Sequence, residues 1–156
     1  MMLRLQIYKY RCADGQHDYK AAGMPSGAYG EFLMRSEGRR AEAYLNAIQD
    51  PVYEEVDQII KTHPRLKGKD AFQLANILRA IFGVACDSDV DGTLFRIGLR
   101  PRCPVCGSGE VSYWEATDPP EMVEKDLPHV THSKWNQLGA DQREALIDKA
   151  LQDLGL

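Results

Sequence analysis

The chain has 156 residues, a length typical of one globular domain with a buried core. Hydrophobic residues make up 44% and charged residues 27% of the sequence, a balance that excludes an intrinsically disordered chain. The formal net charge of −4 disfavours non-specific binding to nucleic acid, which depends on Lys and Arg side chains that neutralise phosphates.

The sequence also predicts a cytoplasmic protein with no membrane partner. Residues 1–12 interleave charged with apolar side chains and lack the continuous apolar core of a signal peptide. No apolar run approaches the roughly 20 residues that a membrane span requires. Thiols stay reduced in the cytosol, so the 4 cysteines favour metal binding over disulfides.

The chain is predicted to begin with strands. Apolar and polar side chains alternate over residues 3–11, which is the period of a half-buried strand. Residues 12–30 are rich in Gly, Asp and Ser and predict a turn followed by an irregular loop. Residues 30–36 predict a second short strand.

Helices are predicted next, over residues 39–49, 51–63 and 70–83. The second of them begins with a proline, which suits the first turn of a helix. The third begins with Asp70 and has Gln73 three positions later, a weaker form of the capping box.

The C-terminal half returns to strands before a final helix. Residues 95–100 alternate and predict a strand that leads into a cysteine pair, and residues 111–114 predict the strand that leaves it. Prolines mark an extended connector over residues 119–128. Apolar residues at helical spacing predict an amphipathic helix over residues 140–154.

These elements predict an α+β fold in a single domain that spans residues 1–156. Residues 1–38 and 84–118 supply the strands and knuckles of a small antiparallel sheet of the zinc-ribbon type. Residues 39–83 form a helical insertion, and residues 119–156 hold the connector and the C-terminal amphipathic helix.

Cys103 and Cys106 form the most specific local signal. Two thiolates three positions apart can grip one tetrahedral ion from a tight turn. Pro104 stiffens that turn, and Gly107 allows the positive φ that brings backbone amides close to sulfur. With predicted strands on both sides, this pattern is typical of the knuckle of a zinc ribbon.

The segment 8–19 carries a second cysteine, Cys12, after an aromatic-rich strand. It resembles the opening of the small FmdB-type regulatory zinc ribbons, in which such a strand runs into a first C-x-x-C knuckle. Together with the second knuckle at Cys103 and Cys106, the resemblance implies a shared knuckle architecture. Gly15 stands where the family has the second cysteine of its first knuckle.

A four-coordinate site needs two ligands besides Cys103 and Cys106, and the sequence leaves several sets open. Cys12 with Cys86 would complete an all-cysteine site, and His17 is an alternative fourth ligand that could reach back over its own turn. A less favoured set pairs the second knuckle with His129 and His132. The remaining alternative is that Gly15 has left the site without metal.

Any bound zinc is predicted to be structural. Four protein ligands leave no coordination position for water, whereas catalytic zinc sites need an open one.

The turn at 87–91 imitates two enzyme or ion-binding motifs. Asp89-Val-Asp91-Gly92 resembles the nucleophile motif of haloacid-dehalogenase-type phosphatases, but polar residues precede it where an apolar strand is required. The same turn begins like a calcium-binding EF-hand loop, yet Gly98 stands where a bidentate Glu is needed. A metal-dependent enzyme at this turn is therefore a minor hypothesis.

The favoured function is a non-enzymatic, zinc-binding adaptor or regulatory protein that acts through protein–protein interaction. Bacterial immunity or antitoxin-like proteins are one instance of that class. The alternative is a nucleic-acid-binding zinc ribbon, because Arg96, Arg100 and Arg102 share one parity along the strand that enters the knuckle.

Overall fold

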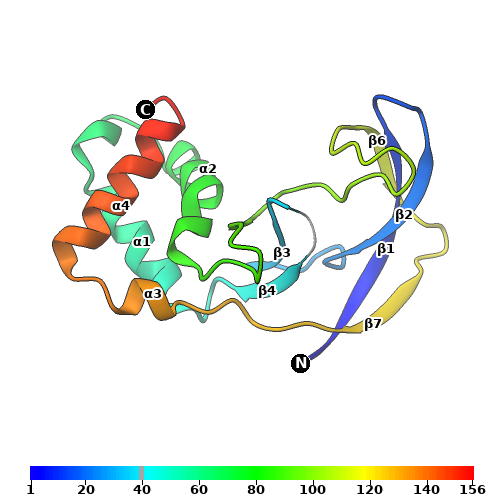
Figure 1. The fold of residues 1–156 in the computed structure, drawn as a ribbon, viewed down its shortest axis with the longest axis horizontal. Helices are drawn as coiled ribbons and strands as arrows, with labels where there is room; N and C mark the ends of the chain where they lie inside the picture. The colour runs from blue at the N-terminus through cyan, green and yellow to red at the C-terminus, as the bar shows by residue number, and fades with distance from the viewer. Residues whose placement is uncertain (39–40) are drawn as a thin grey trace.

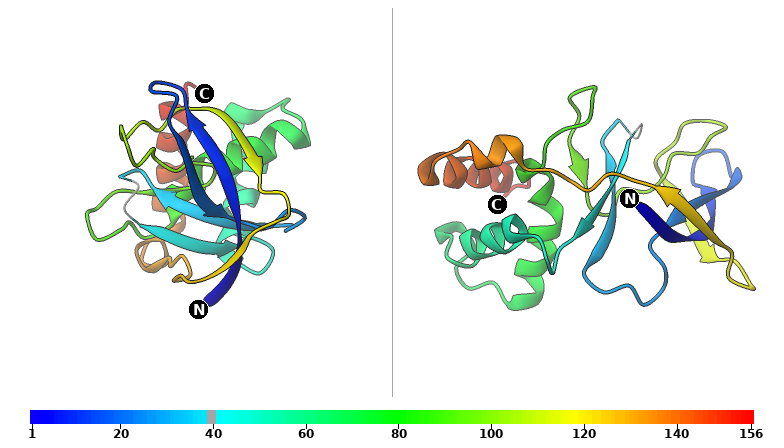
Figure 2. Two further views of the ribbon diagram at one scale, coloured as in Figure 1. Left: turned by 90° about the vertical axis from the view of Figure 1, so that its right-hand side faces the viewer. Right: turned by 90° about the horizontal axis from the view of Figure 1, so that it is seen from below.

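The structure is a computed structural model that describes residues 1–38 and 41–156. It confirms the α+β class, because two small antiparallel sheets combine with a group of helices. The two sheets and the group of helices follow one another along the longest axis of the molecule, with the helices at one end and a sheet at the other (Figures 1 and 2).

The sheet at the end far from the helices, which we call sheet A, is built around one long strand. β1 (Met2–Cys12) pairs antiparallel with β2 (Asp18–Gly23) on one edge. Its other edge pairs with β6 (Val111–Ala116) and then β7 (Met122–Asp126). The predicted loop at 12–30 and the predicted connector therefore both contain a strand, since pairing with β1 satisfies backbone groups that the local sequence leaves open.

The buried face of β1 changes phase along the strand. Leu3 and Leu5 are buried in its first half, whereas Tyr8, Tyr10 and Cys12 are buried in its second half. The first half pairs with β7 and the second half with β6, and strand twist turns the two halves toward different clusters. The predicted alternation with one constant buried face is therefore wrong beyond Leu5, and Cys12 shares its face with the two tyrosines.

The second sheet, sheet B, lies between sheet A and the helices. β3 (Glu31–Ser36) is its central strand, with β4 (Glu42–Asn46) and β5 (Phe95–Arg96) on its two sides. The predicted helix over 39–49 is wrong, because Tyr44 and Leu45 are buried and pair with β3. Sheet pairing outweighs the local helical spacing here. Residues 39 and 40 of that prediction lie outside the described residues.

The predicted strand over 95–100 is much shorter than expected. Only β5 forms, and it pairs with β3 in sheet B instead of leading straight into the knuckle. Gly98 has a φ of 86°, a left-handed conformation that ends the extended run.

The remaining helical predictions are confirmed with small shifts of boundary. α1 (Pro51–Lys61) and α2 (Ala71–Ile81) follow Asp50 and Asp70, and each aspartate caps its helix. The short 3-10 turns η1 (Pro64–Leu66) and η2 (Phe82–Ala85) follow these helices. The C-terminal helix is α4 (Ala140–Asp153), and a single unpredicted turn, α3 (Ser133–Asn136), precedes it.

Two buried clusters at the ends of the molecule differ sharply in kind. The helical end has an extensive aliphatic and aromatic core that includes Trp135, Phe82 and Ile147. The cluster in sheet A consists of Tyr8, Tyr10, Cys12, Tyr19 and Cys103. A third, small cluster of Leu3, Leu5, Leu33, Tyr44 and Leu127 joins the two sheets.

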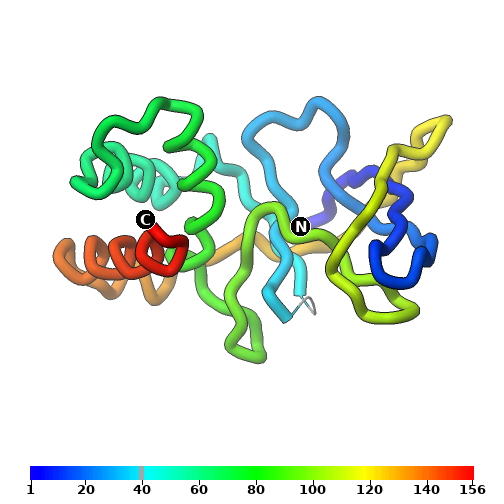
Figure 3. The backbone as a smooth tube through the Cα atoms, turned by 90° about the horizontal axis from the view of Figure 1, so that it is seen from above, coloured from blue at the N-terminus to red at the C-terminus, as the bar shows by residue number. Residues whose placement is uncertain are grey.

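The chain connects the ends through the segments 24–30, 97–102 and 127–132, which can be followed in the tube view (Figure 3). Sheet A therefore brings the N-terminal residues of β1 and β2 together with the knuckle at 103–106 and the strands β6 and β7 that follow it. Among the described residues, none of the helices has the length and apolar character needed to cross a membrane.

Candidate metal site

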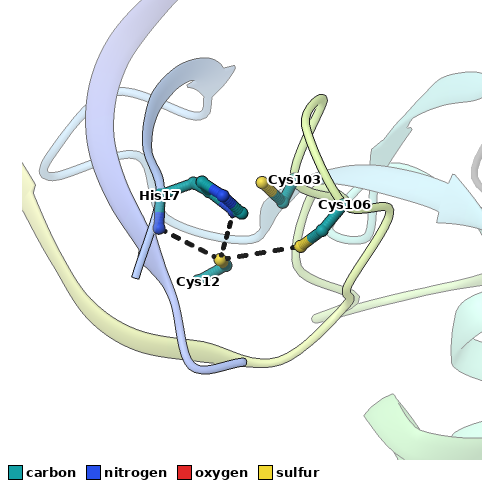
Figure 4. Close-up of side chains that lie close together, drawn as sticks. All are labelled: Cys12, His17, Cys103 and Cys106. Atoms are coloured by element: carbon teal, nitrogen blue, oxygen red, sulfur yellow. Dashed lines mark hydrogen bonds between the residues drawn. The ribbon is translucent and has the colours of Figure 1, made fainter. Parts of the chain in front are cut away.

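Four side chains from two separated segments converge beside sheet A. Cys12 and His17 come from the end of β1 and the turn that follows it, and Cys103 and Cys106 come from the loop before β6. One donor atom from each lies within 4.8 Å of all the others, and the side chains point toward one another (Figure 4). The four residues therefore lie close enough together to bind one metal ion.

The turn after β1 is closed by its own backbone. The Cys12 N–H donates to the His17 carbonyl oxygen at 3.0 Å, and the His17 N–H donates to the Cys12 Sγ at 3.3 Å. Gln16 takes a positive φ of 54°, which turns the chain back over Cys12. The result places the His17 Nδ1 3.4 Å from the Cys12 Sγ.

The loop at 103–108 has the geometry predicted for a knuckle. The Gly107 N–H donates to the Cys103 carbonyl oxygen at 2.8 Å, and the Cys103 N–H donates to the Ser108 carbonyl oxygen at 2.9 Å. Gly107 has a φ of 74°, so the glycine is required for the conformation that was expected of it. Cys103 is buried and Cys106 is exposed at the rim.

Two hydrogen bonds tie the turn and the loop to each other. The Ser108 hydroxyl donates to the Asp14 Oδ2 at 2.6 Å, and the Ala13 N–H donates to the Glu110 carbonyl oxygen at 2.9 Å. The two ligand-bearing segments are thus held in position by contacts besides those of the donor atoms.

The distances fit tetrahedral coordination. Two sulfurs bound to one Zn²⁺ at about 2.3 Å lie about 3.8 Å apart, and a bound sulfur and nitrogen lie about 3.5 Å apart. The Cys12 and Cys106 sulfurs are 3.7 Å apart, far longer than a disulfide, and all four cysteines are free. All four donor atoms lie within 4.8 Å of one another, so shifts of no more than about 1 Å bring them to these separations.

The local electrostatics favour a thiolate at Cys12. Burial raises the pKa of this thiol, but hydrogen bonds from the backbone of His17 and Gly15 and from the Cys106 and His17 side chains together lower the pKa to about 6. At Cys106 the Ser108 backbone lowers the pKa, whereas desolvation and the neighbouring Cys103 and Cys12 raise it to a higher net value. The Cys106 thiol thus favours the thiolate at Cys12, whereas ionisation of Cys106 itself is opposed by its neighbours. A divalent cation beside the sulfurs favours the thiolate form of each.

Cys86 does not join the cluster. It lies in the core of the helical end with 6% of its surface exposed, and its Sγ is 3.8 Å from the Phe82 carbonyl oxygen. Burial raises the pKa of this thiol, so it stays protonated. The all-cysteine set with Cys86 is therefore not assembled, and Cys86 acts as a small apolar core residue.

His129 and His132 are not part of the four-residue cluster either. The His129 ring packs edge-on against Tyr44, with 5.2 Å between ring centroids. The His132 ring nitrogens lie 2.7 Å from the Asp50 Oδ2 and 2.7 Å from the Ala85 carbonyl oxygen. These contacts attach the segment before α3 to sheet B and α1, so the histidine pair is not brought together with the cysteines.

The aspartates of the turn at 87–91 are used within the fold. Asp87 accepts hydrogen bonds from the Thr131 hydroxyl at 2.6 Å and from the Ser133 N–H at 2.8 Å. Asp89 accepts from the Thr93 N–H at 2.8 Å and closes its own loop. Among the described residues, the carboxylates of this turn do not form a cluster that could hold a metal ion.

The three arginines of the nucleic-acid hypothesis do not share one strand face. Arg96 lies in β5 and pairs with Glu37 at 2.7 Å. Arg100 lies over the Trp114 ring at 5.2 Å, and Arg102 contacts the Gly107 carbonyl oxygen at 3.4 Å. Because the extended run ends at Gly98, the parity argument for a shared face is wrong.

Sequence reasoning missed what Gly15 does for the site. The glycine was read only as the place of an absent cysteine, whereas the His17 ring packs directly over it. The histidine two positions later was the available signal.

Comparison of the chain with protein-family models, with curated proteins and with solved structures gives no match, so the functional argument depends on this geometry.

Proposed function

We propose that the protein is a zinc-binding adaptor or regulatory protein that acts through protein–protein interaction. The observation that carries the proposal is the convergence of Cys12, His17, Cys103 and Cys106 at distances that match tetrahedral zinc. This arrangement is a zinc-ribbon site whose first knuckle uses a histidine in place of the cysteine that the FmdB-type resemblance would supply.

The donor set supports zinc and a structural role. Three thiolates and one imidazole are soft to borderline ligands, which select zinc over magnesium or calcium. All four tetrahedral positions come from the protein, so no position is open for a reacting water. The ion would link the end of β1 to the loop before β6 and so hold sheet A together.

Protein interaction is supported by an apolar groove at the helical end. The groove has a volume of about 920 Å³ and lies between α1, α2 and the adjoining end of sheet B. Its walls include Phe32, Leu74 and Leu78. Tyr29 and Ile48, at its edge, are 84% and 67% exposed. Apolar side chains exposed beside a groove are a surface that another protein can cover.

The test separates the two halves of the proposal. Zinc removal with a strong chelator should broaden or shift the amide NMR signals of β1, β2 and β6 and leave those of α1 and α2 in place.

A double variant at the groove, Ile48→Lys with Leu74→Asp, should abolish capture of a partner from cell extract while the zinc content stays at that of the native chain. Equal capture by the variant would remove the groove from the account.

Nucleic-acid binding is the second candidate, and one observation favours it. Tyr113 and Trp114 on β6 are 56% and 47% exposed, and Arg100 lies over the Trp114 ring. Exposed aromatic rings beside a cation can stack with unpaired bases. A single-stranded oligonucleotide whose affinity falls steeply with salt and falls again in Trp114→Ala would favour this candidate.

A further inference from the structure

The His17 ring occupies the space into which a side chain at position 15 would project. An ideal Cβ placed on Gly15 would lie 2.2 Å from the His17 Cε1 and 2.5 Å from its Nδ1. Both distances are far shorter than any ordinary contact between non-bonded heavy atoms. Glycine at position 15 is therefore the condition under which the ring can lie where it does.

The position of the ring is the one that brings its nitrogen to the cysteines. Its Nδ1 is the atom that faces the Cys12 Sγ, at 3.4 Å, and the backbone of the turn is fixed by hydrogen bonds between Cys12 and His17 in both directions. A Cβ at position 15 requires the ring to move by about 1 Å or more, which displaces the Nδ1 from its place beside the Cys12 Sγ.

We propose that Gly15 is a positioning residue that selects His17 as the fourth metal ligand, through its Nδ1 atom, and that positions 15 and 17 are mutually exclusive as sources of this ligand. The inference rests on the proposed metal site. It accounts for the difference from a C-x-x-C pattern: position 15 carries no side chain, and the imidazole from position 17 occupies the space beside it.

The proposal also predicts that a cysteine at position 15 can replace His17 as the fourth ligand. A cysteine at position 15 points its Cβ toward the place of the Nδ1, so its sulfur can replace the nitrogen once the ring is removed. The double variant Gly15→Cys with His17→Ala should therefore recover a site, now with four thiolates.

Cobalt titration of the purified chain tests this directly, because Co²⁺ reports its ligands in its visible and near-ultraviolet absorption. The native chain should bind one Co²⁺ with the spectrum of three thiolates and one nitrogen. Gly15→Ala should lower the affinity about 10–100-fold, as loss of ligand orientation does elsewhere, and His17→Ala should lower it at least as much. The Gly15→Cys/His17→Ala double variant should bind within about tenfold of the native chain, with stronger thiolate charge-transfer absorption.

Two controls keep the outcomes apart. Gly139→Ala places a Cβ no closer than 3.8 Å to its neighbour and should bind Co²⁺ like the native chain. In the native chain, long-range nitrogen NMR of the imidazole should show the proton on Nε2 and the metal on Nδ1. A native chain that binds no metal would overturn the metal site itself. Native binding together with unchanged binding by a folded Gly15→Ala variant, or no binding by the double variant, would overturn only the role of Gly15.

Discussion

The helical end and sheet A bury different kinds of side chain. The helical end buries a broad apolar core in which Trp135, Phe82 and Ile147 are almost wholly excluded from solvent. Sheet A buries three tyrosines and two cysteines, and most side chains of β6 and β7 are exposed. A unit with so little apolar burial usually needs a metal or disulfides to fold, which supports the structural role that we propose for the four-ligand cluster.

The largest expected effect is the unfolding of sheet A while the helical end stays folded. Cys103→Ser removes one of the two buried cysteines of the site, and binding of structural zinc can contribute on the order of 10 kcal/mol to the folding of small zinc units. We expect loss of bound zinc and loss of the dispersed amide signals of β1, β2 and β6, with the helical circular dichroism largely retained. Cys86→Ala, which changes a thiol outside the cluster, should keep its zinc. Equal zinc content in Cys103→Ser and the native chain would contradict the assignment.

A substitution in the helical core should lower stability without changing the metal content of sheet A. Trp135 is 1% exposed, and its Nε1–H donates to the Glu55 Oε2 at 3.2 Å. Truncation of a buried Trp typically costs about 3–5 kcal/mol, so Trp135→Ala should lower the free energy of unfolding by that amount in a urea titration. Its metal content should not change. Trp114→Ala, at a half-exposed ring in sheet A, should cost only about 1 kcal/mol. A larger loss from Trp114 would reverse the comparison.

A smaller effect concerns the junction between α3 and the turn at 87–91. Burial raises the pKa of Asp87, but hydrogen bonds from Thr131, Lys134 and Ser133 outweigh it and lower the pKa to about 2. Since the pKa in the unfolded chain is about 3.9, the stabilisation is complete above that value and is lost as the pH falls toward 2.

Asp87→Asn should therefore lower the free energy of unfolding by about 1 kcal/mol at pH 7, and the difference from the native chain should shrink below pH 4. Thermal unfolding between pH 7 and pH 2 measures it. The exposed Asp153→Asn on α4 is the matched control and should change stability little at any pH. A difference for Asp87→Asn that is independent of pH would contradict a stabilising role of the ionised Asp87 carboxylate.

The smallest effect concerns an arginine of the nucleic-acid alternative. Arg96 pairs with Glu37 on the surface, and both side chains are more than 40% exposed. Exposed pairs contribute little, so Arg96→Ala should change the free energy of unfolding by less than about 0.5 kcal/mol, with no difference at high salt. A large loss of stability would mean that this surface pair has a packing role that its exposure does not indicate.

The sequence was informative where one local pattern determined the structure. The cap at Asp70 and the turn glycine at Gly107 are predicted from residue type and spacing, and each takes the expected conformation. Residues 39–49 show the opposite case. Their apolar spacing suits a helix, but β4 forms there because β3 offers a partner strand that lies outside any local window.

The same distinction applies to the ligands of the candidate metal site. The Cys103–Cys106 knuckle could be read from its spacing, and Cys12 from the aromatic strand before it. The choice among Cys86, His17 and the later histidines could not, because it depends on which segments the fold brings together. In the structure Cys86 lies in the core of the helical end, and His129 and His132 contact sheet B and α1. His17 is the residue that lies with the three cysteines.

The most direct test of the central claim is the metal content of the purified, tag-free chain, combined with X-ray absorption at the zinc edge. We predict about one zinc per chain, surrounded by three sulfurs at about 2.3 Å and one nitrogen at about 2.0 Å. The zinc should be lost in His17→Ala and retained in Cys86→Ala. A chain without zinc, or a four-sulfur shell that disappears when Cys86 is replaced, would contradict the account.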